Sequence, residues 1–220
     1  MKILVIAPHP DDETLGCGGT LFRHKEEGDE LYWAIVTGIS EDIGWPETIV
    51  KKRDAEIETV AKKYRFKDVI AFHLPATKLD TLPLTELIKK ITDIYKKIEP
   101  EIIFIPYIYD VHTDHQIITR AFQSTFKWFR YPHIQKVLMY ETPSETEFNF
   151  VEKRTFNPNI FINISDHLDD KIEAMRIYEN EIGDFPFPRS EKTIRSLAAF
   201  RGSQSGYKAA EAFELVYERI

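Results

Sequence analysis

The pattern that most restricts the fold is the alternation of short apolar runs with longer segments of helical periodicity. Residues 2–7 form a β-branched apolar run bounded by Pro8 and Pro10, which is typical of a buried parallel strand. Residues 83–98, in contrast, carry apolar side chains at three- and four-residue spacing, which is typical of a helix with one buried face. The alternation predicts an α/β fold of the doubly wound, Rossmann-like kind, with a mostly parallel sheet between two helical layers.

The same reading gives the expected elements along the chain. Strands are expected at 2–7, 30–37, 68–72, 101–106, 136–140 and 160–164, and helices at 14–27, 47–64, 83–98, 115–129, 166–181 and from 190 onward. Ser165 is the expected N-cap of the helix at 166–181. Because no repeat or low-complexity tract divides the chain, we expect residues 1–220 to form a single domain.

Charge and composition exclude several classes of protein. The formal net charge is −7, whereas proteins that bind nucleic acid or an anionic membrane usually carry an excess of positive charge. The single cysteine, Cys17, cannot form an internal disulfide and is expected to be a buried thiol. Because no stretch approaches the roughly 20 apolar residues that span a bilayer, we expect a cytoplasmic protein with no membrane partner.

Polar residues follow the first expected strand directly, in the order His9, Pro10, Asp11, Asp12 and Glu13. In an open parallel sheet this position lies at the carboxyl edge of the strands, where ligand crevices form. Acidic residues also favour the first turn of a helix, where they interact with its dipole. We assign only that structural role to Glu13.

A second polar cluster, with Asp110, His112, Asp114 and His115, follows the strand expected at 101–106. Both clusters should therefore reach the same edge of the sheet. Histidine nitrogens and carboxylate oxygens are donors that zinc prefers, and a catalytic zinc uses three of them. Metal-assisted hydrolysis also needs a carboxylate base and a donor to the developing oxyanion. The surplus of candidates over three ligands therefore favours a hydrolytic metal site.

Taken together, the two motifs resemble the PIG-L, or LmbE-like, N-acetylglucosaminyl deacetylase family. The resemblance rests on residues 9–13 after an opening strand, on segment 16–20 that follows, and on residues 112–115. It covers the N-terminal half well and the remainder loosely. The family often has proline at the position of Thr113, which supplies no ligand.

The resemblance implies a zinc-dependent hydrolase that removes the N-acetyl group from an N-acetylglucosamine-type amino sugar or its conjugate. It implies that His9, Asp12 and His115 bind the zinc. Fe²⁺ or another divalent ion could take the place of zinc. The expected partner is a small-molecule amino sugar, and the sequence leaves a homo-oligomer open.

The resemblance also assigns the catalytic groups. Asp11 acts as general base on the zinc-bound water, and His112 stabilises the tetrahedral intermediate or protonates the leaving amine. Asp114 is positioned to hold the His112 imidazolium by a hydrogen bond. We accordingly expect His112 to work as a cation.

The resemblance extends to Arg53 and Glu56 on the helix expected at 47–64. Arg53 lies on the apolar stripe of that helix, three and four residues from Val50 and Ile57. An ion pair with Glu56 would explain a charge on this stripe. The resemblance favours a second explanation, in which Arg53 points into the crevice and binds substrate hydroxyls or phosphate.

Other candidates carry weaker signals. Aromatic side chains near the expected edge could line a sugar pocket but occur as often in cores: Trp45, Tyr107, Tyr109 and Tyr140, the last followed by Glu141. The remaining histidines show no partner pattern and are interpreted as structural or surface groups: His24, His73, His133 and His167.

Three other functions are compatible with parts of the sequence. A nucleotide-binding Rossmann domain fails, because a fingerprint starting at Gly16 has Leu21 where its third glycine should be. A non-catalytic, metal-stabilised sugar-binding module would not need Asp11 and His112. A deacylase that cleaves a non-sugar amide remains open.

Overall fold

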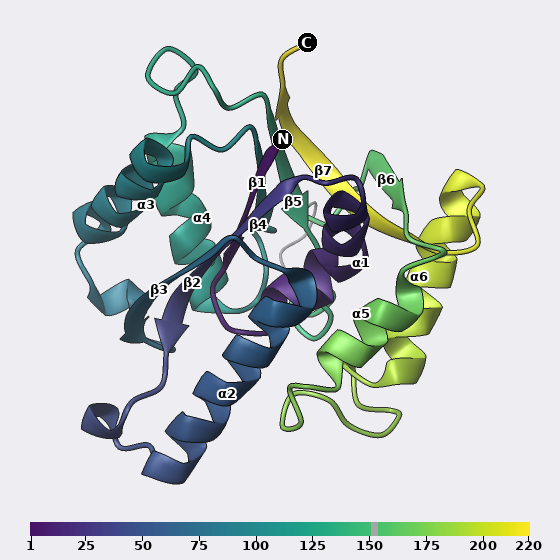
Figure 1. Ribbon diagram of the computed structural model, residues 1–220, viewed down its shortest axis with the longest axis horizontal. Coiled ribbons are helices and arrows are strands. Elements are labelled where there is room, and N and C mark those ends of the chain that lie inside the picture. The colour runs from purple at the N-terminus through teal and green to yellow at the C-terminus, as the bar shows by residue number, and fades with distance from the viewer. Residues whose placement is uncertain (151–153) are drawn as a thin grey trace.

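The computed structural model describes residues 1–150 and 154–220, which form a seven-stranded sheet with helices on both faces (Figure 1). The strands are β1 (Lys2–Ala7), β2 (Glu30–Gly38), β3 (Asp68–Pro75), β4 (Ile102–Pro106), β5 (Lys136–Tyr140), β6 (Ile160–Asn163) and β7 (Ala210–Glu218). The helices are α1 (Asp12–Glu26), α2 (Glu47–Tyr64), α3 (Leu84–Ile98), α4 (Thr113–Thr125), α5 (Leu168–Met175) and α6 (Glu191–Ser205). Short 3₁₀ turns are η1 (Glu41–Ile43) and η2 (Leu79–Thr81).

The strand order is β3-β2-β1-β4-β5-β7-β6, and the first five strands in this order run parallel. β7 runs antiparallel to both β5 and β6. The chain leaves β1 toward β2 and β3 and then returns to the other side of β1 with β4, so the strand order reverses between β1 and β4. Ligand sites of open α/β sheets lie at such a switch point. The predicted doubly wound α/β fold is confirmed.

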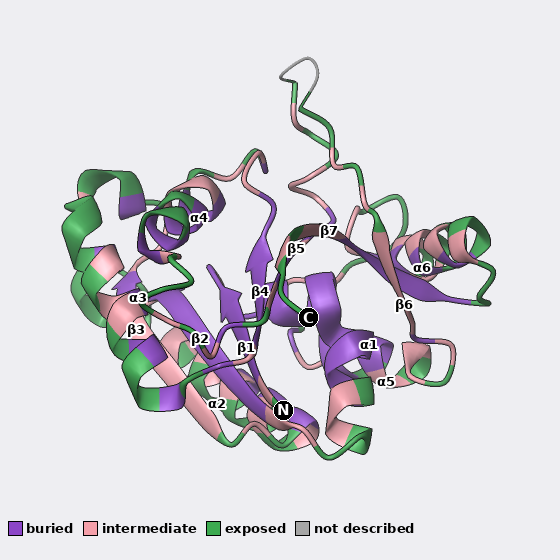
Figure 2. Ribbon diagram, turned by 90° about the horizontal axis from the view of Figure 1, so that it is seen from above, coloured by how far each residue is buried: buried purple, intermediate pink, exposed green. Residues whose placement is uncertain are grey.

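Alternation of side chains along the strands builds one core on each face of the sheet. Ile3 and Val5 pack with α1, α2 and α5, whereas Leu4 and Ile6 pack with α3 and α4. All four side chains are fully or almost fully buried. Figure 2 shows the buried parallel strands between the two helical layers. Burial on both faces explains why these strands read as continuous apolar runs.

Strand β7 was not expected from the sequence. Residues 210–218 were interpreted as part of the helix expected from residue 190 onward. Gly206 ends α6 in the left-handed conformation, at φ 79°, and the chain then enters β7. Alanine and glutamate in residues 210–218 favour helix by intrinsic propensity, so they hide the alternation of a strand. Pairing with β5 and β6 overrides that propensity.

Two expected helices are shorter in the structure than predicted. The helix expected at 115–129 is α4, which ends at Thr125, and the helix expected at 166–181 is α5, which ends at Met175. The predicted N-cap, Ser165, is wrong as well. Its hydroxyl donates to Asn163 Oδ1 at 2.6 Å, and α5 begins after His167.

Helix α1 is kinked at Cys17, where φ is −141° and ψ is 21°, and the thiol is buried as predicted. A buried ion pair between Lys171 and Glu211 binds backbone groups on both sides of this kink. Lys171 Nζ lies 2.6 Å from Glu211 Oε1 and donates to the carbonyl of Leu15 at 2.8 Å. The Glu211 carboxylate accepts the backbone N–H groups of residues 19 and 20 at 2.9 and 2.7 Å. The pair thus satisfies backbone groups that the kink removes from the helix.

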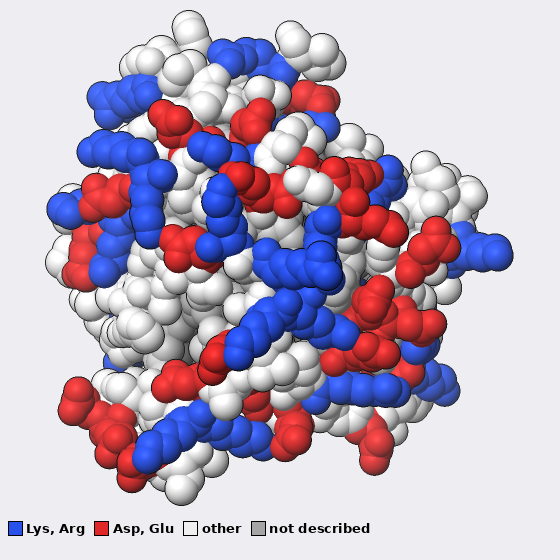
Figure 3. Space-filling model, in the orientation of Figure 1, with Lys and Arg blue, Asp and Glu red and all other residues white. Residues whose placement is uncertain are grey.

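Acidic and basic side chains are intermixed on the face of the molecule shown in Figure 3. Along α2 the basic side chains pair with acidic ones, as in Lys52 with Glu179 at 2.7 Å and Lys63 with Glu173 at 2.8 Å. Within residues 1–150 and 154–220, no helix combines the length and apolarity that crossing a membrane requires.

Candidate metal centre and active site

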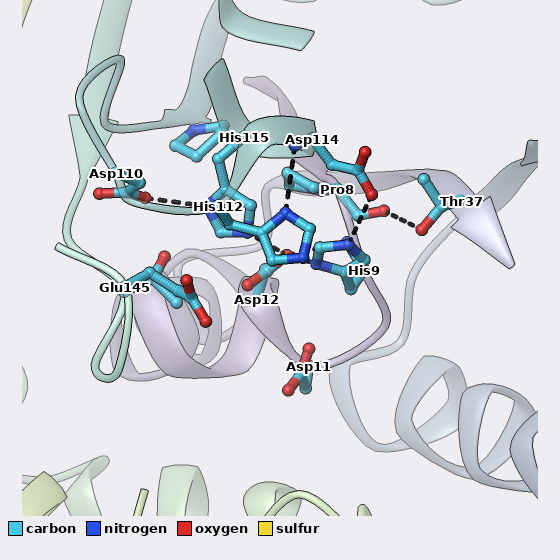
Figure 4. A network of polar contacts seen from close by, with 12 residues as sticks. Pro8, His9, Asp11, Asp12, Thr37, Asp110, His112, Asp114, His115 and Glu145 are labelled. Carbon is cyan, nitrogen blue, oxygen red and sulfur yellow. Dashed lines mark hydrogen bonds and ion pairs between the residues drawn. The ribbon is translucent and has the colours of Figure 1, made fainter. Parts of the chain in front are cut away.

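The two polar clusters meet where β1 and β4 end, at the switch point of the sheet (Figure 4). The loop after β1 carries His9 and leads to Asp12 at the start of α1, and the loop after β4 leads to His115 near the start of α4. One hydrogen bond fixes the first loop, because the Thr37 hydroxyl of β2 donates to the carbonyl of Pro8 at 2.8 Å. The fold therefore brings together residues that are about a hundred positions apart in the chain.

Three side chains converge with one potential ligand atom each. Asp12 Oδ2 lies 3.3 Å from His9 Nδ1 and 3.3 Å from His115 Nε2. The ligand atoms of this trio lie within 4.8 Å of one another. His115 Nε2 is buried and has no hydrogen-bond partner among the described residues. A buried ring nitrogen without a partner, facing a carboxylate, fits the donor set of a divalent cation such as zinc.

A carboxylate stands behind each of the two histidines. His9 Nε2 lies 3.1 Å from Asp114 Oδ2, and His115 Nδ1 lies 2.8 Å from Asp110 Oδ2. The Thr146 hydroxyl in turn donates to Asp110 Oδ1 at 2.6 Å. Histidine ligands of metals usually donate their second ring N–H to such a partner, which fixes the tautomer and the ring orientation. Both imidazoles are therefore oriented to present their other nitrogen toward Asp12.

The charges within the trio keep the Asp12 carboxylate ionised, which favours binding of a cation. Burial by itself would raise the pKa of Asp12, but the positive charges of His115 and His9, each 3.3 Å from its carboxylate, hold that pKa well below its usual range. Burial lowers the pKa of His9, but hydrogen bonds to Asp114 and Asp12 outweigh this and raise it to about 9. Asp12 is thus an anion, and the imidazoles are protonated near neutral pH until a metal displaces their protons.

Asp11 is the aspartate of the first motif that is not part of the trio. It occupies the N-cap position of α1 with φ 138°, and its side chain makes no capping hydrogen bond. Instead Asp11 Oδ2 accepts a hydrogen bond from Arg189 Nη1 at 2.8 Å. Burial, and next the negative charge of Asp12, raise the pKa of Asp11 well above its ordinary value, although Arg189 counteracts them. A buried carboxylate with a raised pKa has the proton affinity that a general base requires.

The environment of His112 differs from the expectation in two respects. Its Nδ1 accepts the backbone N–H of Asp114 at 3.1 Å, which caps the start of α4, while the Asp114 carboxylate bonds His9 and not His112. Burial, and then the positive charges of His9 and His115, lower the pKa of His112 to about 4. The expectation that Asp114 holds His112 is therefore wrong, because the Asp114 carboxylate bonds His9. The lowered pKa of His112 disfavours the cation expected from the sequence. With Nδ1 used as an acceptor, Nε2 is the ring nitrogen of His112 that can donate a hydrogen bond.

The Asp114 carboxylate also organises the loop after β3. Its oxygens accept the backbone N–H groups of Thr77 at 2.7 Å and Leu79 at 3.2 Å. Burial opposes ionisation of Asp114, but its hydrogen bonds with His9 and Thr77 lower its pKa. Asp114 is therefore an ionised carboxylate that supports His9.

Glu13 stands in the first turn of α1, as expected, but its side chain is fully buried. It accepts hydrogen bonds from the backbone of Asp11 at 3.0 Å, from Thr14 Oγ1 at 2.6 Å and from the Tyr178 hydroxyl at 2.9 Å. Burial raises the pKa of Glu13 to about 7. Glu13 thus ties the loop after β1 to the C-terminal half of the chain.

Arg53 reaches the same loop, although the structure satisfies its guanidinium within the chain. It donates to the carbonyl of Pro10 at 3.2 Å and forms an ion pair with Glu181. Its Nε lies 3.4 Å from Glu56, so the ion pair considered from the sequence is present. The guanidinium also packs over the ring of Tyr178, 5.7 Å from its centroid. The substrate-binding role of Arg53 stays a prediction.

Sequence reasoning missed Arg189 and assigned no role to Asp110. Arg189 lies between α5 and α6, and no motif or periodicity marks it. Its guanidinium also contacts Glu145 Oε1 at 3.3 Å. Asp110 lies within the second motif, and its five-residue separation from His115 was the available signal.

The aromatic candidates have mostly structural contacts. The Tyr140 hydroxyl donates to the carbonyl of Ile6 at 2.9 Å, and the ring is fully buried. Tyr107 packs edge-on against Tyr109, with centroids 5.6 Å apart. Glu141, beside Tyr140, pairs with Arg201 at 2.6 Å. Of the loop aromatics proposed from the sequence, Trp45 is exposed.

The chain is similar to known deacetylases in sequence. The sequence model of the PIG-L family, described as GlcNAc-PI de-N-acetylase, matches residues 4–126, which is more than half of the chain. The chain is 26% identical over 231 residues to the diacetylchitobiose deacetylase of Thermococcus kodakarensis, covering 98% of this chain and 83% of that protein.

Solved structures with the same fold include proteins with different activities. The N,N'-diacetylchitobiose deacetylase of Pyrococcus horikoshii superposes with a TM-score of 0.79 at 23% identity, covering 98% of this chain and 84% of that one. The 4-carboxy-2-hydroxymuconate hydratase of Pseudomonas putida superposes with a TM-score of 0.76 at 17% identity, covering 100% and 97%. The fold alone therefore does not determine the reaction, which depends on the residues of the site.

Proposed function

The chain belongs to the PIG-L family, and on that premise we propose that it is a metal-dependent N-deacetylase of an N-acetylglucosamine-type amino sugar or its conjugate. One observation carries the proposal. Two histidines, each backed by a carboxylate, converge on Asp12, and the further carboxylate of Asp11 stays outside this trio. The diacetylchitobiose deacetylase relative supports the amino-sugar substrate class.

In this proposal His9, Asp12 and His115 would hold the metal, with zinc as the expected ion and Fe²⁺ as an alternative. The donor set of two imidazoles and one carboxylate suits either ion. When bound, the metal would polarise the acyl carbonyl and make the attacking water more acidic. Asp110 and Asp114 would keep the two imidazoles oriented.

The chain's own residues account for the proton transfers. Asp11 takes a proton as water adds to the acyl carbon, and it returns this proton to the amine nitrogen as the C–N bond breaks. The products are acetate and the free amino sugar. Because Asp11 is buried and its pKa is raised, it can hold the proton between the two steps.

His112 would stabilise the charge that develops on the former carbonyl oxygen. Since its Nδ1 accepts the backbone N–H of Asp114, its Nε2–H is the group left to donate toward the substrate. The rings of His112 and His9 are 4.4 Å apart, which puts His112 beside the ligand trio. A neutral donor in this position is an oxyanion-hole group and needs no ionisation.

An acetate-release screen tests the proposal. The metal-loaded protein is incubated with N-acetylglucosamine, N,N'-diacetylchitobiose, nucleotide-linked and thiol-conjugated N-acetylglucosamine, and simple non-sugar N-acetyl amides. We expect acetate and free amine in equal amounts from at least one amino sugar. Cleavage of the non-sugar amides alone would transfer the proposal to that substrate class, and no cleavage of any amide would refute it.

A further inference from the structure

We infer that Arg189 is a positioning residue that holds the Asp11 carboxylate in place for its work as general base. The inference rests on the proposed function, because it presumes that Asp11 is the base. It assigns to the segment between α5 and α6 a part in the reaction that no sequence motif indicates.

The conformation of Asp11 requires such a partner. An aspartate at an N-cap usually accepts a hydrogen bond from an N–H group in the first turn of its helix. The Asp11 side chain makes no such bond, and the N–H groups of Thr14 and Leu15 donate to the Asp11 backbone carbonyl at 3.0 and 2.8 Å. The carboxylate thus lacks its ordinary local partner. Figure 4 shows it set apart from the three imidazole rings.

Arg189 supplies the missing contact and is itself firmly fixed. Besides Asp11, its guanidinium donates to Ser144 Oγ at 2.8 Å, to Glu181 Oε2 at 3.0 Å and to Glu145 Oε1 at 3.3 Å. Only 18% of its side chain is exposed. A planar guanidinium with several acceptors has little freedom to move. Arg189 can therefore fix Asp11 Oδ2 and leave the other carboxylate oxygen for water.

A second arginine, Arg53, holds the backbone just before Asp11. Arg53 donates to the carbonyl of Pro10, the residue just before Asp11, at 3.2 Å. Glu181 pairs with both Arg53 and Arg189 and thereby links them. We call Arg53, Glu181 and Arg189 the arginine clamp. The clamp holds the backbone of the base through Arg53 and its side chain through Arg189.

The positive charge of Arg189 also offsets the repulsion between Asp11 and Asp12. Asp11 and Asp12 are adjacent, buried carboxylates, and they repel one another. A buried carboxylate needs a compensating charge or hydrogen bonds to be retained. Asp12 has its histidines, whereas Asp11 has Arg189. Without Arg189 the Asp11 carboxylate would turn away from the site.

The experiment compares Arg189→Ala, Arg189→Lys and the control Arg201→Ala in metal-loaded protein. Arg201 is a matched control because it is also a part-buried arginine of the C-terminal half, and its guanidinium bonds Glu141 and Gln204 but neither Asp11 nor the ligand trio. Displacement of a reacting group by about 1 Å can lower a rate by about 10²-fold. We therefore expect Arg189→Ala to lose about 10²-fold in kcat with KM and metal content little changed. Arg189→Lys should lie between it and the wild type.

Two further measurements separate positioning from a merely structural role. Guanidinium ion at non-denaturing concentration should partly restore kcat of Arg189→Ala, and it should leave Arg201→Ala unaffected. A crystal structure of Arg189→Ala should show the Asp11 carboxylate reoriented, with the ligand trio intact.

The outcomes distinguish this inference from the proposed function. Unchanged kcat and an unmoved Asp11 in Arg189→Ala would overturn the inference. A rate loss that guanidinium does not rescue, with Asp11 in its original place, would also overturn it. A wild-type protein that cleaves no amide, together with a reoriented Asp11 in the crystal, would refute the proposed function and leave the positioning itself supported.

Discussion

His115 Nδ1 lies 2.8 Å from Asp110 Oδ2, and this contact turns the opposite ring nitrogen toward Asp12. Asp110 is fully buried, and the Thr146 hydroxyl holds its second oxygen. The contact therefore fixes the tautomer that a metal ligand needs. The site depends on these supporting residues as well as on the three proposed ligands.

Replacement of Asp110 by asparagine should weaken metal binding without removing a ligand. Loss of a carboxylate behind a histidine ligand typically lowers metal affinity by about 10–100-fold. Competition with a chromophoric chelator measures the change. Asp93→Asn, on the exposed side of α3, is the control and should leave affinity unchanged. Equal affinity of Asp110→Asn and the wild type would show that Asp110 does not support the metal site.

Substitution of Asp11 should lower turnover, whereas substitution of Asp12 should lower metal content. Asp11→Asn removes the proposed base, so we expect normal metal content and a turnover about 10²–10⁴-fold lower. Asp12→Asn removes a proposed ligand, so metal content itself should fall. Elemental analysis together with acetate release measures both. If Asp11→Asn emptied the site and Asp12→Asn did not, the two roles would have to be exchanged.

His112→Gln should slow turnover without altering the basic limb of the pH profile. The pKa of His112 is lowered to about 4, first by burial and then by its neighbouring histidines, so its protonation state does not change above neutral pH. Removal of an oxyanion donor costs about 10²–10³-fold in kcat. Profiles of kcat from pH 5 to 10 for both proteins provide the measurement. A basic limb that disappears in the variant would restore His112 as a titrating acid.

Metal binding should become tighter as the pH rises toward 9. Hydrogen bonds to Asp114 and Asp12 outweigh burial and raise the pKa of His9 to about 9. Near neutral pH the metal must therefore displace a proton from this imidazole, and the affinity levels off once His9 is already neutral. The same shift stabilises the metal-free protein below the unfolded pKa of 6.5, and this stabilisation is lost as pH rises through 9.

Calorimetry in buffers of different ionisation enthalpy measures the proton release directly. We expect protons to be released on zinc binding at pH 7, with smaller release at pH 9. Binding with the same affinity and no proton release across this range would contradict the assigned environment of His9.

Lys171→Met should destabilise the fold while leaving the ligand trio unaltered. The substitution leaves the buried Glu211 carboxylate without its cation, although the N–H groups of residues 19 and 20 still bind it. Breaking a buried ion pair costs about 3 kcal/mol or more, which corresponds to about 6–12 °C in Tm for a chain of this size. The exposed pair of Lys52 and Glu179 offers the control, because Lys52→Met should cost less than about 1 kcal/mol. Equal losses in Tm for both variants would contradict the structural role of the Lys171 pair.

The sequence was sufficient for the features that depend on local patterns. The runs that form β1 and β4 are buried on both faces and read as strands, and the two motifs follow them directly. Because parallel strands end at one edge, the meeting of His9 with His115 could be predicted without coordinates.

Features that depend on distant contacts could not be predicted. Arg189 meets Asp11 across 178 positions, and β7 forms only because β5 and β6 offer partners. The surroundings of His112 could not be predicted either. Its pKa is lowered first by burial and then by the charges of His9 and His115, and its Nδ1 accepts the backbone N–H of Asp114. The motif indicates none of these contacts.

A metal titration of turnover tests the metal dependence of the proposed deacetylase most directly. Chelator-treated protein is titrated with zinc, and in parallel with Fe²⁺ under anaerobic conditions, while acetate release from the amino sugar found in the screen is followed. We expect no acetate without metal, a linear rise in rate, and a plateau near one ion per chain, with His115→Ala failing to reach it. Full activity in the chelator-treated protein, or a rate that does not respond to either ion, would show that the deacetylase does not depend on a metal at this site.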